Sequence, residues 1–278
     1  MSQYSPQTIR RTLQPLYGPS EAAALSRIVC CELMGQQAVD FYLGKDMQLS
    51  ANDEMHLQDI LERLLHDEPI QYIQGTAPFL GRTLQVKPGV LIPRPETAEL
   101  VEWMLEHVPA DAHILDVGTG SGCIALTLAS RLPQARVAAW DVSDEALAVA
   151  RANAEAWGVE VDFHHRDMLT YQPSQERYDV VVSNPPYVTD SEKRDMERNV
   201  LDWEPPLALF VPDDDPLRFY RRLAELGRVL LRPGGTLYLE INRAYGAAVA
   251  RLLQSGGYVE VQIRRDSFGN ERFVKATS

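Results

Sequence analysis

The chain has 278 residues, of which 45% are apolar and 24% charged, and its formal net charge is −12 at pH 7. This length and apolar content suffice for one large or two ordinary globular domains. The acidic balance argues against a nonspecific hold on nucleic-acid phosphates, and no apolar run approaches the ~20 residues that span a bilayer. Three cysteines, two of them adjacent (Cys30 and Cys31), form no disulfide or CxxC pattern, and MSQYSPQTIRRTL lacks the apolar core of a signal peptide. We therefore expect a cytoplasmic protein without a metal site and without membrane insertion.

The first 75 residues predict a small helical domain. Ser5, Ser20 and Ser50 each stand where an N-cap would open a helix, and Asp53 follows Ser50 at the spacing of a capping box. This segment carries five basic and ten acidic residues. An electrostatic hold on nucleic acid is therefore not expected here, and a packing or partner-docking role is favoured.

The pattern changes twice after residue 75. Residues 76–92 place Gly and Pro between short β-prone pieces, which predicts a hairpin that joins two domains. From Ile114 onward strand-like and helical segments alternate, which is typical of a mostly parallel, doubly wound sheet. The last two strand-like segments, YVEVQIRRD and RFVKAT, predict a terminal antiparallel hairpin.

The stretch ILDVGTGSG places Gly118, Gly120 and Gly122 between the first of these strands and a helix. Glycines at such a turn let a ligand lie against the backbone and the N–H groups at the helix start, although a tight turn without a ligand has the same pattern. A dinucleotide site requires Gly or Ala at the sixth position, where this chain has Cys123, and the carboxylate of Asp116 would repel a pyrophosphate. The pattern therefore favours a cationic ligand.

Two further acids follow strand ends. Asp141 ends the second strand, where a carboxylate can accept two ribose hydroxyls, and Asp167 ends the third, where it can accept from an adenine amino group with Met168 beside the ring. Either acid alone also fits a helix cap or a solvated loop. Ligands of open α/β sheets bind beyond the carboxyl ends of the strands, and the glycine loop, both acids and Asn184 occupy four such ends. A ligand with ribose, adenine and a cationic amino-acid tail is S-adenosylmethionine.

The run YDVVVSNPPYV leaves a strand through Asn184, Pro185, Pro186 and Tyr187. Each proline restricts the preceding residue to extended geometry, so the loop is stiff before a substrate arrives. The Asn184 side-chain oxygen and the Pro185 carbonyl can each accept one proton of an NH₂ group, and Tyr187 can lie flat against a planar amide or base. The motif predicts methylation of a planar, sp²-bound nitrogen, with a rigid surface turn as the alternative. Alone it does not distinguish adenine, guanine and a glutamine side chain.

DVGTGSG together with SNPPY resembles the class I methyltransferases that act on such nitrogens. The segments EPIQYIQGTAPFLG, VKPGVLIPRPETAELVE, SNPPYV, EPPLALF and RDSFGNERFV, in this order, resemble the release factor glutamine methyltransferase family of the HemK/PrmC type over nearly the whole chain. The resemblance implies an α/β class I S-adenosylmethionine-dependent methyltransferase domain (93–278) with a Rossmann-like seven-stranded sheet. It also implies an N-terminal helical substrate-docking domain (1–75) and a linking β-hairpin (76–92). The implied reaction is methylation at N5 of the glutamine in the GGQ motif of class I peptide chain release factors, which modulates translation termination.

The motifs and the resemblance together give an expected site. The catalytic residues would be Asn184, Pro185 and Tyr187, and the same loop with Pro186 would hold the substrate glutamine. The segment 93–97 would lie near the methionine end of the cofactor or would only begin a helix. The expected cofactor contacts are Asp116, Gly118, Thr119, Gly120, Ser121, Gly122, Asp141, Asp167, Met168 and Asn184.

Two segments depart from the family pattern. VPDDDPL, residues 211–217, stands where the family often has a glycine pair and Asp-Gly-Leu, and we expect its three acids to form a solvated turn. EINRAYG places Asn242 and Tyr245 where the family has glycine and glutamine. These changes bear on substrate docking more than on the methyl transfer.

Two other functions remain as alternatives. An adenine-N6 DNA or RNA methyltransferase would share the NPPY chemistry but would want a basic groove and a target-reading domain for a flipped base, against which the acidic N-terminal segment argues. A noncatalytic S-adenosylmethionine-binding protein is disfavoured because Asn184 and the glycines are intact. We expect a monomer with no stable binding to nucleic acid.

Overall fold

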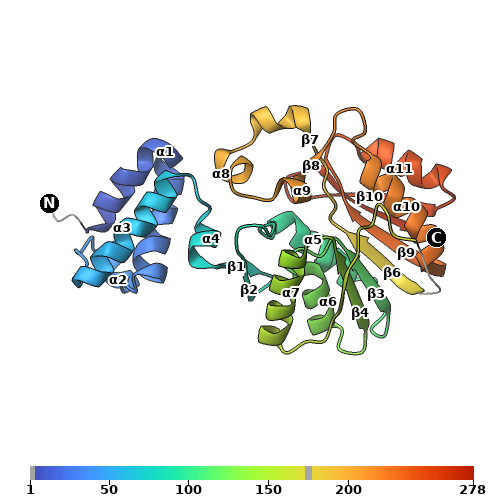
Figure 1. Ribbon diagram of the computed structural model, residues 1–278, viewed down its shortest axis with the longest axis horizontal. Helices are drawn as coiled ribbons and strands as arrows, with labels where there is room; N and C mark the ends of the chain where they lie inside the picture. Colours follow the sequence, from blue (N-terminus) through green and yellow to red (C-terminus); the bar gives the residue numbers. More distant parts are fainter. Residues whose placement is uncertain (1–3, 173–176) are drawn as a thin grey trace. The chain divides into compact units, whose positions relative to one another are not determined.

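The computed structural model describes residues 4–172 and 177–278 (Figure 1). The chain divides into two compact units. Unit 1 comprises Met1–Gly75 and Arg198–Trp203, and unit 2 comprises Thr76–Glu197 and Glu204–Ser278.

Unit 1 is helical. Its core brings together apolar side chains of the two longest helices, including Ile9, Leu13, Leu57 and Ile60. In the described residues it contains α1 (Pro6–Arg27), the π-helical segment η1 (Ile28–Leu33), α2 (Ala38–Tyr42), α3 (Ala51–Leu65), α4 (Ile70–Gln74) and α8 (Arg198–Leu201).

The predicted helix starts in unit 1 agree with the structure at Ser5 and Ser50, and the one at Ser20 lies within two residues of a break in α1. Ser5 caps α1, accepting from the Thr8 backbone N–H at 3.1 Å, and Ser50 forms the predicted capping box with Asp53 at the start of α3. The start predicted at Ser20 falls just after a kink at Gly18 that divides α1 into two helical stretches. The only nonhelical residue inside α1 is Gly18, with φ 71° and ψ 174°, so the break falls where glycine tolerates a positive φ.

Unit 2 carries a seven-stranded sheet in the part of the chain that the structure describes, with strand order β10-β11-β9-β6-β3-β4-β5. The neighbours β9, β6, β3, β4 and β5 are parallel, whereas β11 runs antiparallel to both β9 and β10. The predicted fold class and the terminal antiparallel hairpin are therefore confirmed. The strands of this sheet are β3 (His113–Val117), β4 (Arg136–Asp141), β5 (Asp162–His165), β6 (Tyr178–Ser183), β9 (Leu231–Glu240), β10 (Val259–Arg265) and β11 (Glu271–Thr277).

Helices cover both faces of this sheet (Figure 1). Successive side chains of a strand point to opposite faces, and Ile114 of β3 packs in one core cluster while Leu115 packs in the other. One cluster includes α5 (Pro95–Leu105), α6 (Cys123–Arg131) and α7 (Asp144–Trp157). The other includes α10 (Arg218–Leu230) and α11 (Gly246–Ser255). Because both faces are buried, the inner strands read as continuous apolar runs.

A short hairpin precedes the sheet. Strands β1 (Thr76–Phe79) and β2 (Arg82–Gln85) pair antiparallel through a two-residue turn in which Leu80 (φ 45°) and Gly81 (φ 79°) both have positive φ. Asn153 of α7 bonds to both sides of Gln85, accepting from its N–H at 2.7 Å and donating to its carbonyl at 3.0 Å. The same amide donates to the Ser121 carbonyl at 2.9 Å, so one side chain joins the hairpin to the glycine loop.

An excursion between β6 and α10 was not predicted. It contains the parallel two-residue strands β7 (Val188–Thr189) and β8 (Phe210–Val211), the 3₁₀ segment η2 (Asp190–Asp195) and α9 (Pro206–Leu209). This pairing fixes the segment that follows the NPPY residues. No helix in residues 4–172 and 177–278 combines the length and the apolarity needed to traverse a bilayer.

Candidate active site

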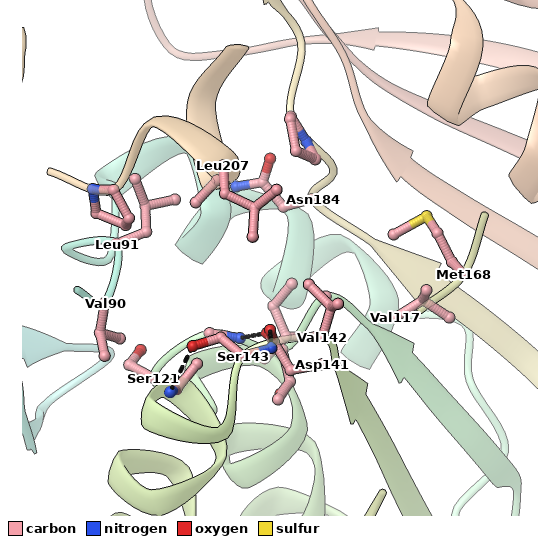
Figure 2. A pocket seen from close by; sticks show the side chains of 18 of the residues that line it. Val90, Leu91, Val117, Ser121, Asp141, Val142, Ser143, Met168, Asn184 and Leu207 are labelled. Carbon is pink, nitrogen blue, oxygen red and sulfur yellow. Dashed lines mark hydrogen bonds between the residues drawn. The ribbon is translucent and has the colours of Figure 1, made fainter. Parts of the chain in front are cut away.

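A cavity of about 250 Å³ lies within unit 2 beyond the carboxyl ends of the parallel strands. In Figure 2 its lining residues Asp141 and Ser143 lie on one side and Asn184 and Leu207 on the other. Of the predicted site residues, those that line the cavity are Gly118, Thr119, Gly120, Ser121, Asp141, Asp167, Met168, Asn184 and Pro186. Asp116, Gly122, Pro185 and Tyr187 are adjacent in sequence to lining residues and are not lining residues themselves.

The glycine loop connects β3 to α6 and depends on backbone conformations that favour glycine. Gly118, Gly120 and Gly122 have φ of 80°, 57° and 86°. A Cβ on Gly122 would lie 2.9 Å from a methyl carbon of Leu126, so close packing as well as φ requires glycine there. The loop therefore has its curved shape before any ligand binds.

Asp141 holds this loop as well as lining the cavity. Its carboxylate accepts from the Gly120 N–H at 2.8 Å and from the Ser143 N–H at 2.9 Å. Burial raises its pKa, and the two backbone hydrogen bonds oppose that shift. From the sequence, Asp141 was expected to bind ribose or else to cap a helix or lie in a solvated loop, whereas in the structure it ties the end of β4 to the glycine loop.

Asp116 is fully buried on β3 behind the loop. It accepts from the Thr119 hydroxyl at 2.6 Å through Oδ2, and Oδ1 has no hydrogen-bond partner among the described residues. Burial raises the pKa of this carboxyl to about 7. A carboxyl with one unsatisfied oxygen behind the glycine loop suits a cationic ligand better than an anionic one.

The segment after β5 forms another wall. The Asp167 carboxylate accepts from the Leu169 N–H at 2.9 Å and from the Thr170 hydroxyl at 3.2 Å, so it shapes its own turn. Arg222 of α10 donates to the carbonyls of Met168 and Tyr171, at 2.9 Å and 2.5 Å. No sequence pattern indicated Arg222, which holds this wall of the cavity although it lies 54 residues beyond Met168 in the chain.

The NPPY loop is held by side chains from other elements. Asn184 Nδ2 donates to Thr97 Oγ1 at 3.1 Å, and Thr97 donates in turn to Glu240 Oε2 at 2.7 Å. The Tyr187 hydroxyl donates to the other oxygen of Glu240 at 3.0 Å, and burial raises the pKa of the Glu240 carboxyl to about 6. Glu240 was not predicted as a site residue. The only feature of the sequence that could have indicated it is the carboxylate at the end of the apolar strand LYLE.

The two departures from the family pattern both bear on the excursion after β6. Asn242 donates to the Tyr187 carbonyl at 3.1 Å and to the Glu192 carboxylate at 2.9 Å, so it supports the NPPY loop. Asp213 accepts from the Ser191 N–H at 3.0 Å, and this hydrogen bond lowers its pKa. The expected turn is solvent-exposed at Asp213 and Asp214, but Asp213 also has a structural bond.

The segment 93–97 begins a helix, as one of its two interpretations expected, and it also lines the cavity. Pro95 is the first residue of α5, and Pro93, Arg94 and Thr97 line the cavity. Arg94 pairs with the buried carboxylate of Glu204 at 2.6 Å. A helix N-terminus and a cavity wall are thus the same segment.

Curated relatives match almost the whole chain, and two family models match separate parts of it. Residues 7–75 match the PrmC N-terminal domain, and residues 96–202 match the methyltransferase small domain. A release factor glutamine methyltransferase of Bacteroides thetaiotaomicron is 55% identical over 269 residues, which cover 96% of this chain and 97% of the relative. One of Flavobacterium psychrophilum is 39% identical, and the match covers 95% of each chain.

Among solved structures, a methyltransferase of Pyrococcus furiosus superposes with a TM-score of 0.55 at 18% sequence identity. The superposition covers 79% of this chain and 98% of the other. At this identity the likeness concerns the fold alone.

Proposed function

Because the chain belongs to the release factor glutamine methyltransferase family, we propose that its cavity binds S-adenosylmethionine and that Asn184 holds the substrate glutamine against the cofactor's methyl group. The chain is an S-adenosylmethionine-dependent protein-(glutamine-N5) methyltransferase. The observation that carries the assignment of residues is that Asn184, the glycine loop and Asp141 line one cavity.

The residues around the cavity fit the chemical parts of this cofactor. The glycine loop offers a curved backbone at a helix start, and Asp141 has acceptor capacity beyond its two N–H donors for ribose hydroxyls. Asp116, buried behind the loop, would favour the cationic end of the cofactor in its ionised form, and the positive charge of that end would in turn favour ionisation. Met168 and Asp167 provide an apolar surface and an acceptor for the adenine.

The bound cofactor supplies a methyl group on a positively charged sulfur, which is the electrophile. A neutral amide nitrogen is a poor nucleophile because its lone pair is delocalised, so the protein acts mainly by position and polarisation. The Asn184 Oδ1 and the Pro185 carbonyl accept the two N–H protons of the glutamine and direct its nitrogen toward the methyl group. Tyr187, anchored on Glu240, supports the loop that makes these contacts.

We propose class I release factors, with the glutamine of their GGQ motif, as the substrate, and unit 1 as the domain that docks them. Residues 7–75 match a domain model of the same family, and α2 with the residue after it exposes Val39, Tyr42 and Leu43. A protein substrate fits such an apolar surface better than nucleic acid does. This substrate also supports a cytoplasmic location, and we propose that the enzyme is a monomer.

A competition assay tests this function. The protein is incubated with methyl-labelled S-adenosylmethionine, a class I release factor and duplex DNA together, and the label is located after separation and proteolysis. We expect label on the GGQ-containing peptide, and none on a release factor whose GGQ glutamine is changed to alanine. Label on DNA alone would reject the proposal.

A further inference from the structure

Glu240 is a fully buried carboxylate at the end of β9, beside the end of β6 from which Asn184 follows. A charge in such a place is costly unless it is well paired. No Lys or Arg in the described residues forms a salt bridge with Glu240; Arg272, whose charge lowers the Glu240 pKa, is paired with Asp266 at 3.2 Å. The two partners of the carboxylate are instead hydroxyl groups, one on Thr97 and one on Tyr187.

The contacts of Glu240 form an ordered chain of donors. An ionised carboxylate only accepts hydrogen bonds, so the Thr97 hydroxyl must point its proton at Glu240. The Thr97 oxygen is then left with lone pairs only, and the group facing it at 3.1 Å must be a donor. Of the two ends of the Asn184 amide, only the NH₂ end can donate.

We propose that Glu240 and Thr97 set the direction of the Asn184 amide, so that its oxygen and not its nitrogen faces the substrate. This inference rests on the proposed function, in which Asn184 Oδ1 accepts a proton from the glutamine NH₂. An asparagine amide turned by 180° would present its own NH₂ to the substrate NH₂, and two donors repel each other. Glu240 and Thr97 are therefore positioning residues, and Asn184 is the residue that touches the substrate.

The direction of the amide matters more here than the strength of any one bond. Asn and Gln amides have ends of nearly equal size, so sterics alone does not select one orientation. Glu240 is separated from the Asn184 amide by two hydrogen bonds and can only accept. It therefore selects one orientation of the amide, because only one arrangement of the Thr97 hydroxyl and the Asn184 amide leaves no donor facing a donor. The buried carboxylate accepts in every orientation, whereas a neutral amide at this position would accept from Thr97 in only one of its two orientations.

Variants at position 97 test the relay directly. Thr97→Val keeps the shape and removes the hydroxyl, and we expect the single-turnover rate at saturating cofactor and release factor to fall by about 10- to 100-fold. Thr97→Ser restores the hydroxyl and should recover most of the rate. Glu240→Gln, which can still accept from Thr97 in one of its two orientations, should give a smaller loss than Thr97→Val.

A matched control separates this effect from the loss of a buried hydroxyl in general. Thr127 of α6 is also buried, and its hydroxyl donates to the Cys123 carbonyl of its own helix at 2.7 Å. Thr127→Val should therefore keep the wild-type rate. Affinity for S-adenosylmethionine, measured by calorimetry, should change by less than about threefold in the Thr97 variants, because their effect is on the orientation of Asn184.

The decisive measurement is a double-mutant cycle with Asn184→Ala. If Thr97 acts through Asn184, Thr97→Val should cost little further rate once Asn184 is absent, so the two effects are strongly non-additive. Additive effects, or a Thr97→Ser variant as slow as Thr97→Val, would overturn the relay. An Asn184→Ala variant with the wild-type rate would instead reject the role of Asn184 in the proposed function, which is a separate result.

Discussion

The glycine loop and the NPPY loop face the same cavity but are built in different ways. The glycine loop takes its shape from its own backbone, through three glycines at positive φ and through N–H groups bound to the end of β4. The NPPY loop takes its orientation from side chains far away in the sequence: Thr97 is 87 residues from Asn184, and Glu240 is 53 residues from Tyr187. The first loop could be recognised from a short stretch of sequence, whereas the partners of the second required the fold.

This difference has a functional counterpart. A loop defined by its backbone keeps its shape under most side-chain substitutions, which suits the binding of one invariant cofactor. A loop oriented by a relay of side chains can present a defined acceptor to a substrate, but it depends on each member of the relay. Substitutions in the two loops should therefore differ in whether they reduce the rate, the cofactor affinity or the stability, and five experiments measure this.

The largest effect is expected from Asn184→Ala. Removing the acceptor for the glutamine NH₂ should lower the single-turnover rate at saturating cofactor by about 10² to 10³, the scale for one preorganised hydrogen bond at a reacting centre. Cofactor affinity should fall much less than the rate, and the melting temperature should barely move. Near wild-type methylation of the release factor would reduce the NPPY stretch to a stiff turn.

A substitution in the glycine loop should reduce the stability of the fold, whereas Asn184→Ala should reduce the rate. Gly122→Ala forces an L side chain to φ 86° and into contact with Leu126, so we expect a loss of about 2 to 3 kcal/mol in the free energy of unfolding. Gly158→Ala is the matched control, with φ 65° and no heavy atom within 4 Å of the added carbon, and should cost only about 1 kcal/mol. Urea unfolding measures both. Equal losses would show that the contact with Leu126 relaxes freely.

Asp141 has both a structural and a binding role, because it holds the glycine loop and also lines the cavity. Asp141→Ala should weaken S-adenosylmethionine binding by about 1.5 to 3 kcal/mol, since ribose hydroxyls lose a charged acceptor and Gly120 loses its anchor. Asp141→Asn keeps one acceptor oxygen, so its affinity for S-adenosylmethionine should lie between those of the wild type and Asp141→Ala. Calorimetry decides the matter, and unchanged affinity in the alanine variant would leave Asp141 only its structural bonds.

The smallest effect concerns pH. Burial raises the Glu240 pKa to about 6 from an ordinary value of 4.5, so the folded state favours the protonated acid. Ionised Glu240 therefore destabilises the fold. The loss of unfolding free energy grows as the pH rises from about 4.5 to about 6 and reaches its full size above about pH 6. Relative to Glu240→Gln, the wild type should lose about 2 kcal/mol of unfolding free energy between pH 4 and pH 8. Glu240 interacts electrostatically with five other charged or titratable groups, which are Glu96, Cys123, Tyr187, Tyr220 and Arg272.

The rate should respond to pH in the opposite direction. Only the ionised carboxylate is restricted to accepting, so the relay to Asn184 needs the form that the fold disfavours. The single-turnover rate of the wild type should therefore fall as pH drops through about 6, and that of Glu240→Gln should show less of this fall. Parallel pH profiles for the two proteins would contradict an effect of Glu240 ionisation.

The sequence predicted what local patterns encode. The strand RVAAWD matches β4 residue for residue, because an apolar run between a polar start and a carboxylate has few other readings in an α/β chain. The start at Ser20 was displaced by two residues, because the break that separates the two helical stretches of α1 falls at Gly18. The β7–β8 pair was missed because strands of two residues, separated by 20 residues, leave no periodicity to detect.

The same reasoning explains which site residues escaped prediction. Asp141 and Asn184 follow strands and were found from their position alone. Glu240 also ends a strand, but its importance lies in the partners Thr97 and Tyr187, which no local pattern connects to it. Arg222 lies in RFYRRLAELGRVL, a strongly amphipathic helical stretch. An arginine on the polar face of such a helix is expected to be solvated, so its contact with the cavity wall was not predicted.

The side chain of Asn153 has a consequence for how the opening of the cavity can be observed. It bonds to the Ser121 carbonyl in the glycine loop and, on its other edge, accepts from the amide of Gln85 in β2. Any fluctuation that detaches Asn153 as the glycine loop opens also exposes the Gln85 amide to exchange with solvent deuterium. Slower exchange at Gln85 when the cofactor is added would thus report loop rigidity from a residue outside the cavity, in a signal independent of turnover.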